Sequence, residues 1–323
     1  MKLKQLQYLW ETYNQNLNMS EAARVLNTTQ PGISSGIRRL EVELGIDLLT
    51  RKGKRLGLTP AGERIVQLAR DTLQKVDSIE RAAAEFQHED RGSLRIATTH
   101  TQARYVLPEH IRNFRSSYPD VSLHINQGTP AQLAELTLNG DVDFAIATEG
   151  FEHFSNLILA PCYTWNRSII VPKGHPLASV DEISLAQVAA EPLVTYVFGF
   201  AGGSSVANAF ANARLSANVA FTATDTDVIK KYVRLGVGIG IIASMAREPN
   251  TDEDLVFLDA SHLFEPSVTH IGLRPEVFLR SYMYDFIESF AEHLTRPLVE
   301  QVLSSSRRHE QQLLLEGFEL PRR

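Results

Sequence analysis

The stretch from Ser20 to Leu40 reads SEAARVLNTTQPGISSGIRRL and decides how the first part of the chain folds. It predicts a short helix with Ser20 as its N-cap, a polar turn, and a second helix opened by Thr29 with Pro31 in its first turn, because these residue types stabilise helix starts. Such a pair is typical of a helix-turn-helix, whose second helix lies in the DNA major groove. An ordinary two-helix corner of a protein core has the same pattern.

Each predicted helix has one apolar face and one polar face. The residues expected to be buried, at the spacing of a helical stripe, are Ala22, Ala23, Leu26, Ile33, Ile37 and Leu40. The small alanine pair lets the two helices cross closely. On the outer face of the second helix, Gln30, Ser34 and Ser35 would face base edges and Arg38 would hold a phosphate.

A basic hairpin follows and favours the DNA-binding interpretation. Arg51, Lys52, Lys54 and Arg55 surround Gly53 between two short apolar runs. A charge run is usually a solvated face, but this one stands where a winged helix needs a wing that contacts phosphates. Residues 1–59 hold nine Lys or Arg against five Asp or Glu, a net charge of +4, whereas the whole chain has −6 and the remainder therefore −10. That asymmetry predicts a polyanion-binding head on an acidic body.

Composition limits the remaining classes of protein. A chain of 323 residues with 43% hydrophobic and 22% charged residues is typical of a globular protein of two or three domains. No apolar run approaches the length of a membrane span, and the N-terminus lacks the apolar core of a signal peptide, so the expected compartment is the cytoplasm. Cys162 is the only cysteine, which excludes an intrachain disulfide and a thiolate zinc site.

Residues 60–89 are predicted to form one long helix with Thr59 as its N-cap and Pro60 as its first residue. A narrow apolar seam runs along it at steps of four and three, formed by Ile65, Ala69, Thr72, Val76, Ile79, Ala83 and Phe86. A helix packed only on its own domain is the alternative, but the charged remaining positions favour pairing with a second copy, as recognition of two half-sites requires. Residues 88–92 would act as a hinge.

From residue 93 strands and helices alternate, which predicts mostly parallel sheets with helices on both faces. The expected elements of the first lobe are strand 93–98, helix 103–117, strand 121–127, helix 131–139 and strand 143–148. The second series has strands 168–172, 192–196, 219–222 and 238–243, a helix after residue 203 and a helix at 225–235. Strand 269–273 and helix 278–294 would return to the first lobe. A cleft between two such lobes suits a small ligand.

Polar residues gather where the first strand of this region meets its first helix. Thr98, Thr99, Thr101 and Gln102 offer hydroxyls and an amide near a helix start, which favours a small anion held by neutral donors. Helix capping is the simpler explanation, but it needs only one of them. Thr148 would face the same cleft at the end of its strand. We expect the second lobe to add donors from the glycine-rich turn 196–204, and Trp165 at the crossover to offer an indole N–H or to serve core packing.

No catalytic arrangement is recognisable, so an enzyme is not expected, and neither a metal nor a cofactor is predicted. The glycines of 236–240 resemble a dinucleotide fingerprint, but they follow a helix and lead into a strand, the reverse of what that motif requires. A solute-binding protein built on the two lobes is a competing class. The basic head and the missing signal peptide argue against it.

Several motifs together resemble the LysR-type transcriptional regulators, in the branch that contains CysB and Cbl. In the head they are Ala22-Ala23, Thr29–Ser34, Arg39–Glu41, Leu44-Gly45 and Leu58–Gly62; beyond it they are Ile96–Tyr105, Asp143–Thr148, Pro161–Tyr163, Trp165–Ser168 and Arg280–Phe286. The likeness covers nearly the whole chain. It implies a winged helix-turn-helix head, a long dimerisation helix and a two-lobed α/β effector domain like that of periplasmic binding proteins.

The resemblance also implies a function. Such a regulator would be a homotetramer that binds promoter DNA, with RNA polymerase as a further partner, and would control sulfur assimilation genes in response to N-acetylserine, O-acetylserine or an oxyanion such as sulfate or thiosulfate. A regulator of another pathway is the alternative. Two departures put operator and effector preference in question. Ser35-Gly36 replace a basic residue and a glutamine, and Ala201 and Gly203 replace a threonine and an arginine.

The sequence thus gives a full set of expectations. The expected domains are a winged helix-turn-helix at 1–59, a dimerisation helix at 60–89, an effector domain at 90–294 and a helical tail at 295–323. Within the effector domain, lobe I is about 93–164 and 269–294, and lobe II about 165–268. The expected DNA-contacting residues are Thr29, Gln30, Pro31, Ser34, Ser35, Arg38, Arg51, Lys52, Lys54 and Arg55. The expected effector-contacting residues are Thr99, Thr101, Gln102, Thr148, Trp165, Ala201 and Gly202.

Overall fold

The computed structural model divides the chain into two compact units, residues 1–87 and 88–323, which are described separately. It describes residues 1–52, 55–87, 90–148, 151, 154, 156–197, 199–200, 204–275, 277–305 and 307–323. For residues 51, 52, 55, 81, 82 and 84–87 only the backbone is described. Gly53, Lys54, Ala201, Gly202 and Gly203 lie outside the described residues, so the expectations for them stay expectations.

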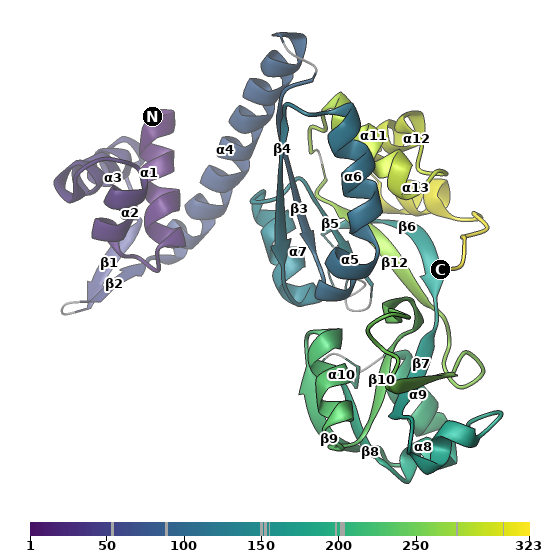
Figure 1. The fold of residues 1–323 in the computed structure, drawn as a ribbon. Coiled ribbons are helices and arrows are strands. Elements are labelled where there is room, and N and C mark those ends of the chain that lie inside the picture. Colours follow the sequence, from purple (N-terminus) through teal and green to yellow (C-terminus); the bar gives the residue numbers. More distant parts are fainter. Residues whose placement is uncertain are drawn as a thin grey trace. The chain divides into compact units, whose positions relative to one another are not determined.

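The first unit is a helical head followed by a hairpin and a long helix (Figure 1). Its elements are α1 (Leu3–Asn14), α2 (Met19–Val25), α3 (Gln30–Leu44), β1 (Leu49–Lys52), β2 (Arg55–Leu58) and α4 (Pro60–Gln87). The predicted apolar stripes are confirmed: Ala22, Ala23, Ile33, Ile37 and Leu40 are buried in one core, with Leu26 packed against it. The antiparallel pairing of β1 with β2 confirms the hairpin.

Helix starts in the head agree with the sequence at α3 and α4 but not at α2. Thr29 caps α3, where its hydroxyl accepts from Gly32 N at 3.3 Å, and Thr59 caps α4, where it accepts from Gly62 N at 2.9 Å. The prediction of Ser20 as the cap of α2 was wrong. Asn18 is the cap, because its amide oxygen accepts from Ser20 N and Glu21 N at 3.1 and 3.2 Å, and α2 begins one residue before Ser20.

Gly36 has a packing role that the sequence did not reveal. A Cβ atom at this position would lie 2.4 Å from Cδ2 of Tyr8. Tyr8 of α1 is itself buried in the head core. The glycine therefore lets α1 and α3 approach closely, which explains a residue that otherwise costs roughly 1 kcal/mol in a helix interior.

The apolar seam of α4 is shared between two environments. Ala69 is buried in the head core together with Val66, and Ile65 packs against it. Further along the seam Ile79 is 68% exposed, and Leu68, which precedes Ala69 and lies outside the seam, is 47% exposed. The first turns therefore bury their seam residues within their own head, while Ile79 on a later turn leaves an apolar side chain open.

The second unit consists of two lobes, each with a five-stranded sheet. In the first lobe the strand order is β4-β3-β5-β12-β6, from β3 (Gly92–Thr98), β4 (Val121–Gln127), β5 (Phe144–Ala147), β6 (Ile158–Trp165) and β12 (Ser267–Leu273). In the second the order is β11-β7-β10-β8-β9, from β7 (Arg167–Pro172), β8 (Pro192–Tyr196), β9 (Asn218–Ala223), β10 (Ile239–Ala243) and β11 (Leu255–Asp259). The chain passes from the first lobe to the second between β6 and β7, and Figure 1 shows β6 continuing into β7. It returns to the first lobe between β11 and β12.

The expectation of mostly parallel sheets was wrong, because both sheets are mixed. β3 pairs in parallel with β4 and β5, and β8 with β9 and β10. β12 pairs antiparallel with β5 and β6, and β7 antiparallel with β10 and β11. The antiparallel strands adjoin the connection between the lobes, where the chain leaves one sheet and later returns, so they are not linked by βαβ units.

Helices cover these sheets, with some boundaries that differ from the predictions. The helices are α5 (His100–Tyr105), α6 (Leu107–Ser117), α7 (Pro130–Asn139), α8 (Leu185–Ala189), α9 (Ser205–Asn212), α10 (Thr226–Arg234) and α11 (Ser281–Phe290), with short 3-10 turns at Pro176–Ser179 and Ser244–Ala246. The single helix predicted at 103–117 is two helices that meet at Val106. Pro108, in the first turn of α6, cannot donate the hydrogen bond that would continue α5.

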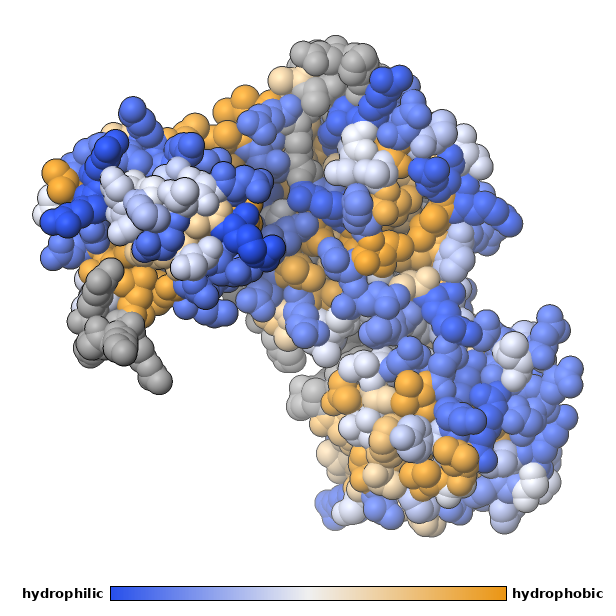
Figure 2. Space-filling view, turned by 60° about the vertical axis from the view of Figure 1, so that its left-hand side comes forward, coloured by the Kyte–Doolittle hydropathy of each residue, from blue (hydrophilic) through white to orange (hydrophobic). Residues whose placement is uncertain are grey.

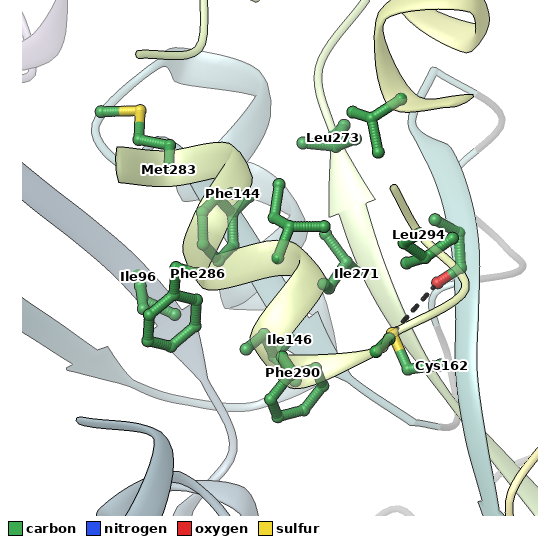
Figure 3. Close-up of a cluster of buried hydrophobic side chains, with 14 of the residues drawn as sticks. Ile96, Phe144, Ile146, Cys162, Ile271, Leu273, Met283, Phe286, Phe290 and Leu294 are labelled. Carbon is green, nitrogen blue, oxygen red and sulfur yellow. Dashed lines mark hydrogen bonds between the residues drawn. The ribbon is translucent and has the colours of Figure 1, made fainter. Parts of the chain in front are cut away.

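The return of the chain to the first lobe is confirmed by β12 and by α11. Figure 3 shows Phe286 and Phe290 of α11 beside Phe144, Ile146 and Ile271 of the sheet, all buried in one cluster. Cys162 lies in the same cluster and its thiol contacts the Ala160 carbonyl oxygen at 3.5 Å. The tail adds α12 (Arg296–Ser304) and α13 (Arg308–Leu315), whose residues Val299, Val302 and Leu315 join this core.

Candidate effector site and nucleic-acid interface

The predicted DNA-facing residues of α3 lie on its accessible side. Gln30, Ser35 and Arg38 are exposed and Ser34 is half-buried. Thr29 and Pro31 are also exposed at the start of the helix. The buried residues Ile33 and Ile37 anchor the opposite side, so apolar packing beneath the helix presents the polar side chains.

The backbone of the wing is fixed to the head by a residue that the sequence analysis did not single out. The Glu41 carboxylate at the end of α3 accepts hydrogen bonds from Leu48 N and Leu49 N at 2.9 and 3.0 Å. The register then pairs Lys52 with Arg55, which places these cations at the end of the hairpin. Their side chains, that of Arg51 and the whole of Lys54 are not described. A charge at Glu41 thus orients the hairpin that carries the basic cluster.

A pocket lies where the two lobes meet, and it contains the effector residues predicted from the described part of the chain. About 330 Å³ of space, partly open to solvent, is lined by Thr99, Thr101, Gln102, Pro130, Thr148, Trp165, Tyr196 and Ala243. Thr99 and Thr101 come from the start of α5, Thr148 follows β5, and Trp165 ends β6. The second lobe supplies Tyr196 of β8 and Ala243 of β10.

A chain of buried polar side chains forms one wall of this pocket. The Tyr163 hydroxyl donates to Gln102 Oε1, and Gln102 Nε2 donates to Thr269 Oγ1 at 3.3 Å. The hydroxyls of Thr269 and Thr148 lie 3.1 Å apart, and Trp165 Nε1 donates to Thr148 Oγ1 at 3.3 Å. Burial raises the pKa of Tyr163 to about 12, so its hydroxyl stays protonated and available as a donor.

A second polar chain crosses from one lobe to the other. Thr101 of α5 and Thr226 of α10 have their hydroxyl oxygens 3.2 Å apart. The Tyr196 hydroxyl lies 2.7 Å from the same Thr226 oxygen and accepts from Ala243 N at 3.3 Å. A ligand that replaced the contact between Thr101 and Thr226 would therefore touch both lobes at once.

Ion pairs join the lobes at the rim of the pocket. Arg104 of α5 pairs with Asp227 at 2.7 Å and with Glu248 at 3.1 Å, both in the second lobe. The Tyr105 hydroxyl donates to Asp227 at 2.8 Å, and burial raises the pKa of this tyrosine. The short helix that carries Thr99 and Thr101 is thus held to α10 by its other end.

The pocket itself has a neutral lining with a cation behind it. None of the described residues that line it is a Lys or an Arg. Arg167 is only 3% exposed, and its guanidinium lies 5.0 Å from the ring of Trp165 while donating to Ser267 Oγ at 2.9 Å. The Thr99 side chain makes no capping hydrogen bond to α5, so helix capping does not account for its hydroxyl. Hydroxyl, amide and indole donors backed by a buried positive charge suit a small polar anion.

Sequence reasoning missed several residues of this site. The missed residues contact the polar side chains of the site from positions far along the chain, and they are Tyr163, Thr269, Thr226 and Arg167. Nothing in their local sequence distinguishes them from core residues, except that Tyr163 and Arg167 flank the Trp165 that was selected. Tyr196, which also lines the pocket, begins the turn 196–204 from which donors were expected. Thr98, by contrast, donates to Ile146 O at 2.9 Å and belongs to the sheet, not to the pocket.

Other chemistries find no support among the described residues. The structure shows no group of His, Cys, Asp or Glu side chains there that could hold a metal ion. In the same part of the chain, no helix is long and apolar enough to cross a membrane. The glycines at 236–240 follow α10 and lead into β10, as expected, and a Cβ at Gly238 would lie 2.2 Å from the carbonyl oxygen of Pro192, so close strand packing explains that glycine.

Comparison with known families agrees with this architecture. Residues 3–63 match the model of the bacterial regulatory helix-turn-helix protein of the lysR family, and residues 87–295 match the LysR substrate binding domain. The chain therefore belongs to the LysR family of bacterial transcriptional regulators. This confirms the class of protein that the motifs predicted, with a DNA-binding helix-turn-helix head and a two-lobed effector domain.

Three relatives define the similarity further. The HTH-type transcriptional regulator CysB of Haemophilus influenzae is 51% identical over 321 residues, which cover 99% of each chain. The HTH-type transcriptional regulator SsuR of Burkholderia cenocepacia is 45% identical over 94% of this chain and 99% of its own. A crystal structure of the cofactor-binding domain of the Cbl transcriptional regulator has 40% identity and a TM-score of 0.63, and covers 67% of this chain and 95% of that one. These relatives are named as regulators and not as enzymes, in agreement with the sequence analysis.

Proposed function

We propose that this regulator controls sulfur assimilation genes, either those of cysteine biosynthesis or those for sulfate starvation and alkanesulfonate use. A small effector bound between the lobes would set its state. The proposed effectors are N-acetylserine, O-acetylserine and sulfur oxyanions such as sulfate or thiosulfate. The proposal is supported by the identity to regulators named CysB and SsuR along the whole chain.

The observation that carries the effector proposal is the pocket at the lobe junction. Thr99, Thr101, Gln102 and Thr148 offer neutral donors, and the buried Arg167 adds a positive charge nearby. A carboxylate or sulfur oxyanion would accept hydrogen bonds there, and the charge of Arg167 would replace that of a counter-ion from solution. The segment with Ala201 and Gly202 would add main-chain contacts from the second lobe.

The head is proposed to bind promoter DNA through α3 and the wing. Gln30, Ser34 and Ser35 would contact bases, whereas Arg38 and the wing cations would contact phosphates. The support is the exposure of the polar face of α3 and the net charge of +4 in residues 1–59. Ser35 is shorter and uncharged compared with the basic residue expected in this branch, so we expect fewer base or phosphate contacts at that point.

Self-association is the third part of the proposal. On α4 the exposed Ile79 and Leu68 offer apolar contacts for a second copy. In the second lobe, Val219 of the edge strand β9, Val228 of α10 and Leu235 at the end of α10 are exposed apolar residues. Figure 2 shows apolar side chains gathered on one face of this lobe. A homodimer joined through α4 and a homotetramer joined through the lobes would cover both surfaces. Effector binding would shift the balance between assembly geometries and so change how paired heads sit on DNA.

Calorimetric titration of the full chain tests the effector proposal. We would titrate N-acetylserine, O-acetylserine, sulfate and thiosulfate into the wild type, into Thr101→Val and into Thr222→Val. The first variant removes a pocket hydroxyl at nearly constant volume, and the second makes the same change at an exposed position of β9. We expect saturable binding of at least one compound, weakened roughly tenfold by Thr101→Val because a hydrogen bond to a charged ligand is lost.

The matched control should bind like the wild type. Equal weakening by both variants would point to a general loss of stability and would contradict the assignment of Thr101 to the site. Absence of binding by all four compounds would contradict the sulfur-related effector.

A further inference from the structure

The last residues of the chain cover the open edge of β6. β6 is the edge strand of the first lobe sheet, with β12 on its inner side. On its outer side Thr164 N donates to the Pro321 carbonyl oxygen at 2.9 Å, and Arg323 N donates to the Thr164 carbonyl oxygen at 2.9 Å. Figure 1 shows the C-terminus beside this strand. We call the segment Pro321–Arg323 the strap. It satisfies main-chain groups that an edge strand otherwise leaves open.

The strap also contacts the side chains that lead into the pocket. The Arg323 guanidinium carbon lies 4.8 Å from the centre of the Tyr163 ring and 5.8 Å from that of Phe290. Tyr163 is fully buried, and its hydroxyl donates to Gln102, a residue that lines the pocket. A cation against one face of the ring therefore lies a single side chain away from an effector-facing amide.

His110 holds the guanidinium in this position from the side of α6. Its Nε2 atom lies 3.2 Å from Arg323 Nη2, so a neutral imidazole can accept a hydrogen bond there. Burial lowers the pKa of His110, and the charge of Arg323 lowers it further, while the neighbouring Glu109 has the opposite effect. The neutral ring is thus the form favoured near neutral pH. Other polar contacts come from Ser289 of α11, whose hydroxyl lies 3.5 Å from His110 Nδ1.

We propose that the strap sets the effector affinity of the pocket, with Arg323 as a positioning residue that acts through Tyr163 and Gln102. The inference rests on the proposed effector function of the pocket. Arg323 stacks on Tyr163, Tyr163 fixes the Gln102 amide, and Gln102 in turn fixes Thr269, Thr148 and Trp165 through the buried hydrogen bonds. Removing the strap would leave the main-chain N–H and carbonyl of Thr164 without these partners and allow the polar wall to change its geometry.

Tryptophan fluorescence gives a direct readout, because the chain has two tryptophans and only Trp165 lines the pocket. In a Trp10→Phe background the emission reports the surroundings of Trp165. We would compare Arg323→Ala with Arg307→Ala, which removes the same charge from an exposed position of the tail. We expect Arg323→Ala to shift the Trp165 emission in the ligand-free protein and to weaken N-acetylserine binding roughly two- to fivefold, as the loss of an exposed cation–π contact implies. Arg307→Ala should change neither.

A double-mutant cycle separates positioning from general stability. Tyr163→Phe keeps the ring under the guanidinium but removes the hydroxyl that reaches Gln102. If Arg323 acts through that hydroxyl, Arg323→Ala should have little further effect on affinity or emission in the Tyr163→Phe background. Additive effects of the two changes would overturn the proposal, as would unchanged emission and affinity in Arg323→Ala.

The test also distinguishes the two proposals. If the wild type binds none of the four compounds, the effector proposal fails, while the emission of ligand-free Arg323→Ala still decides whether the strap positions Trp165. If Arg323→Ala unfolds, Arg323→Lys, which keeps a cation at the ring, provides the comparison; full retention of emission and affinity by this variant supports the cation–π contact, and a loss as large as that of Tyr163→Phe contradicts it.

Discussion

The head and the effector domain hold their functional side chains in opposite ways. In the head, Gln30, Ser35 and Arg38 project from α3 into solvent, and the helix is fixed by an apolar core beneath them. In the effector domain, Gln102 and Thr148 are buried and bonded to other polar side chains. The head can therefore change its contacts one residue at a time, whereas a change in the pocket affects several residues together.

The largest expected effect on stability comes from removing a buried charge in the effector domain. Lys230 is 1% exposed and its ammonium lies 2.6 Å from Asp252 Oδ2 and 2.6 Å from the Ala246 carbonyl oxygen. Lys230→Met should destabilise the effector domain by about 3 kcal/mol, because the buried Asp252 carboxylate loses its buried cation and keeps only the more exposed Arg234 as a charged partner. Urea unfolding measures the change, and Lys231→Met, at an exposed position of the same helix, is the control.

The same pair gives a dependence on pH. Burial opposes ionisation of Asp252, but the hydrogen bonds from Lys230, Glu248 N and Arg234, together with the charge of Lys230, outweigh it, so the pKa of Asp252 is lowered. Stability from this pair should be present above the ordinary carboxyl pKa and be lost as the pH falls through the lowered value. An acid midpoint that stays the same in Lys230→Met would contradict that account.

A smaller effect is expected from Thr269, which connects the two halves of the polar wall. Thr269→Val should cost about 1–3 kcal/mol, because Gln102 and Thr148 each lose a hydrogen-bond partner in a buried place. Its effect should be non-additive with that of Thr148→Val in unfolding experiments.

In the head, by contrast, Gln30→Ala and Arg38→Ala should change DNA affinity additively. Additivity in the pocket, or strong coupling in the head, would remove the contrast between the two regions.

Gly36→Ala tests whether packing outweighs helix propensity in the head. Alanine gains roughly 1 kcal/mol of helix propensity, but overpacking in a filled core costs roughly 1–3 kcal/mol. A Cβ 2.4 Å from the Tyr8 ring makes the second effect larger, so we expect a net loss of about 1 kcal/mol in thermal unfolding of the head. Tyr8→Leu should relieve it. A more stable Gly36→Ala protein would show that Tyr8 moves aside at no cost.

The smallest change in stability is expected at the wing, where the effect should appear in binding. Arg51→Ala together with Lys52→Ala should weaken DNA binding for all sequences and lower the salt slope by about 2, since each phosphate contact contributes about 0.9. Unfolding should change little, because substitutions of charged residues in a hairpin usually shift stability by no more than about 0.5 kcal/mol. Gel-shift or anisotropy titrations at several salt concentrations measure the slope; an unchanged slope would contradict the wing assignment.

Much of the fold could be predicted because it is encoded locally. The stripes of the head, the caps Thr29 and Thr59 and the strands β4 and β8 agree with the sequence pattern, as these depend on periodicity and nearby hydrogen bonds. Prediction failed where alternatives were locally equal. Asn18 and Ser20 are both good caps. The strands β6 and β11 were not predicted, and β6 contains Pro161, which an edge strand tolerates.

The sequence by itself determined the class of protein, the polar face of α3, the basic hairpin and the cluster of hydroxyls at 98–102. The residues of each feature lie close together in the chain, so composition and spacing are enough to predict it. Only the tertiary structure decided that Tyr163, Thr269 and Thr226 complete the pocket, that Gly36 receives Tyr8, and that the strap reaches β6. Those contacts join positions far apart in the chain, and their partners are chosen by sheet order and close packing, which no local pattern records.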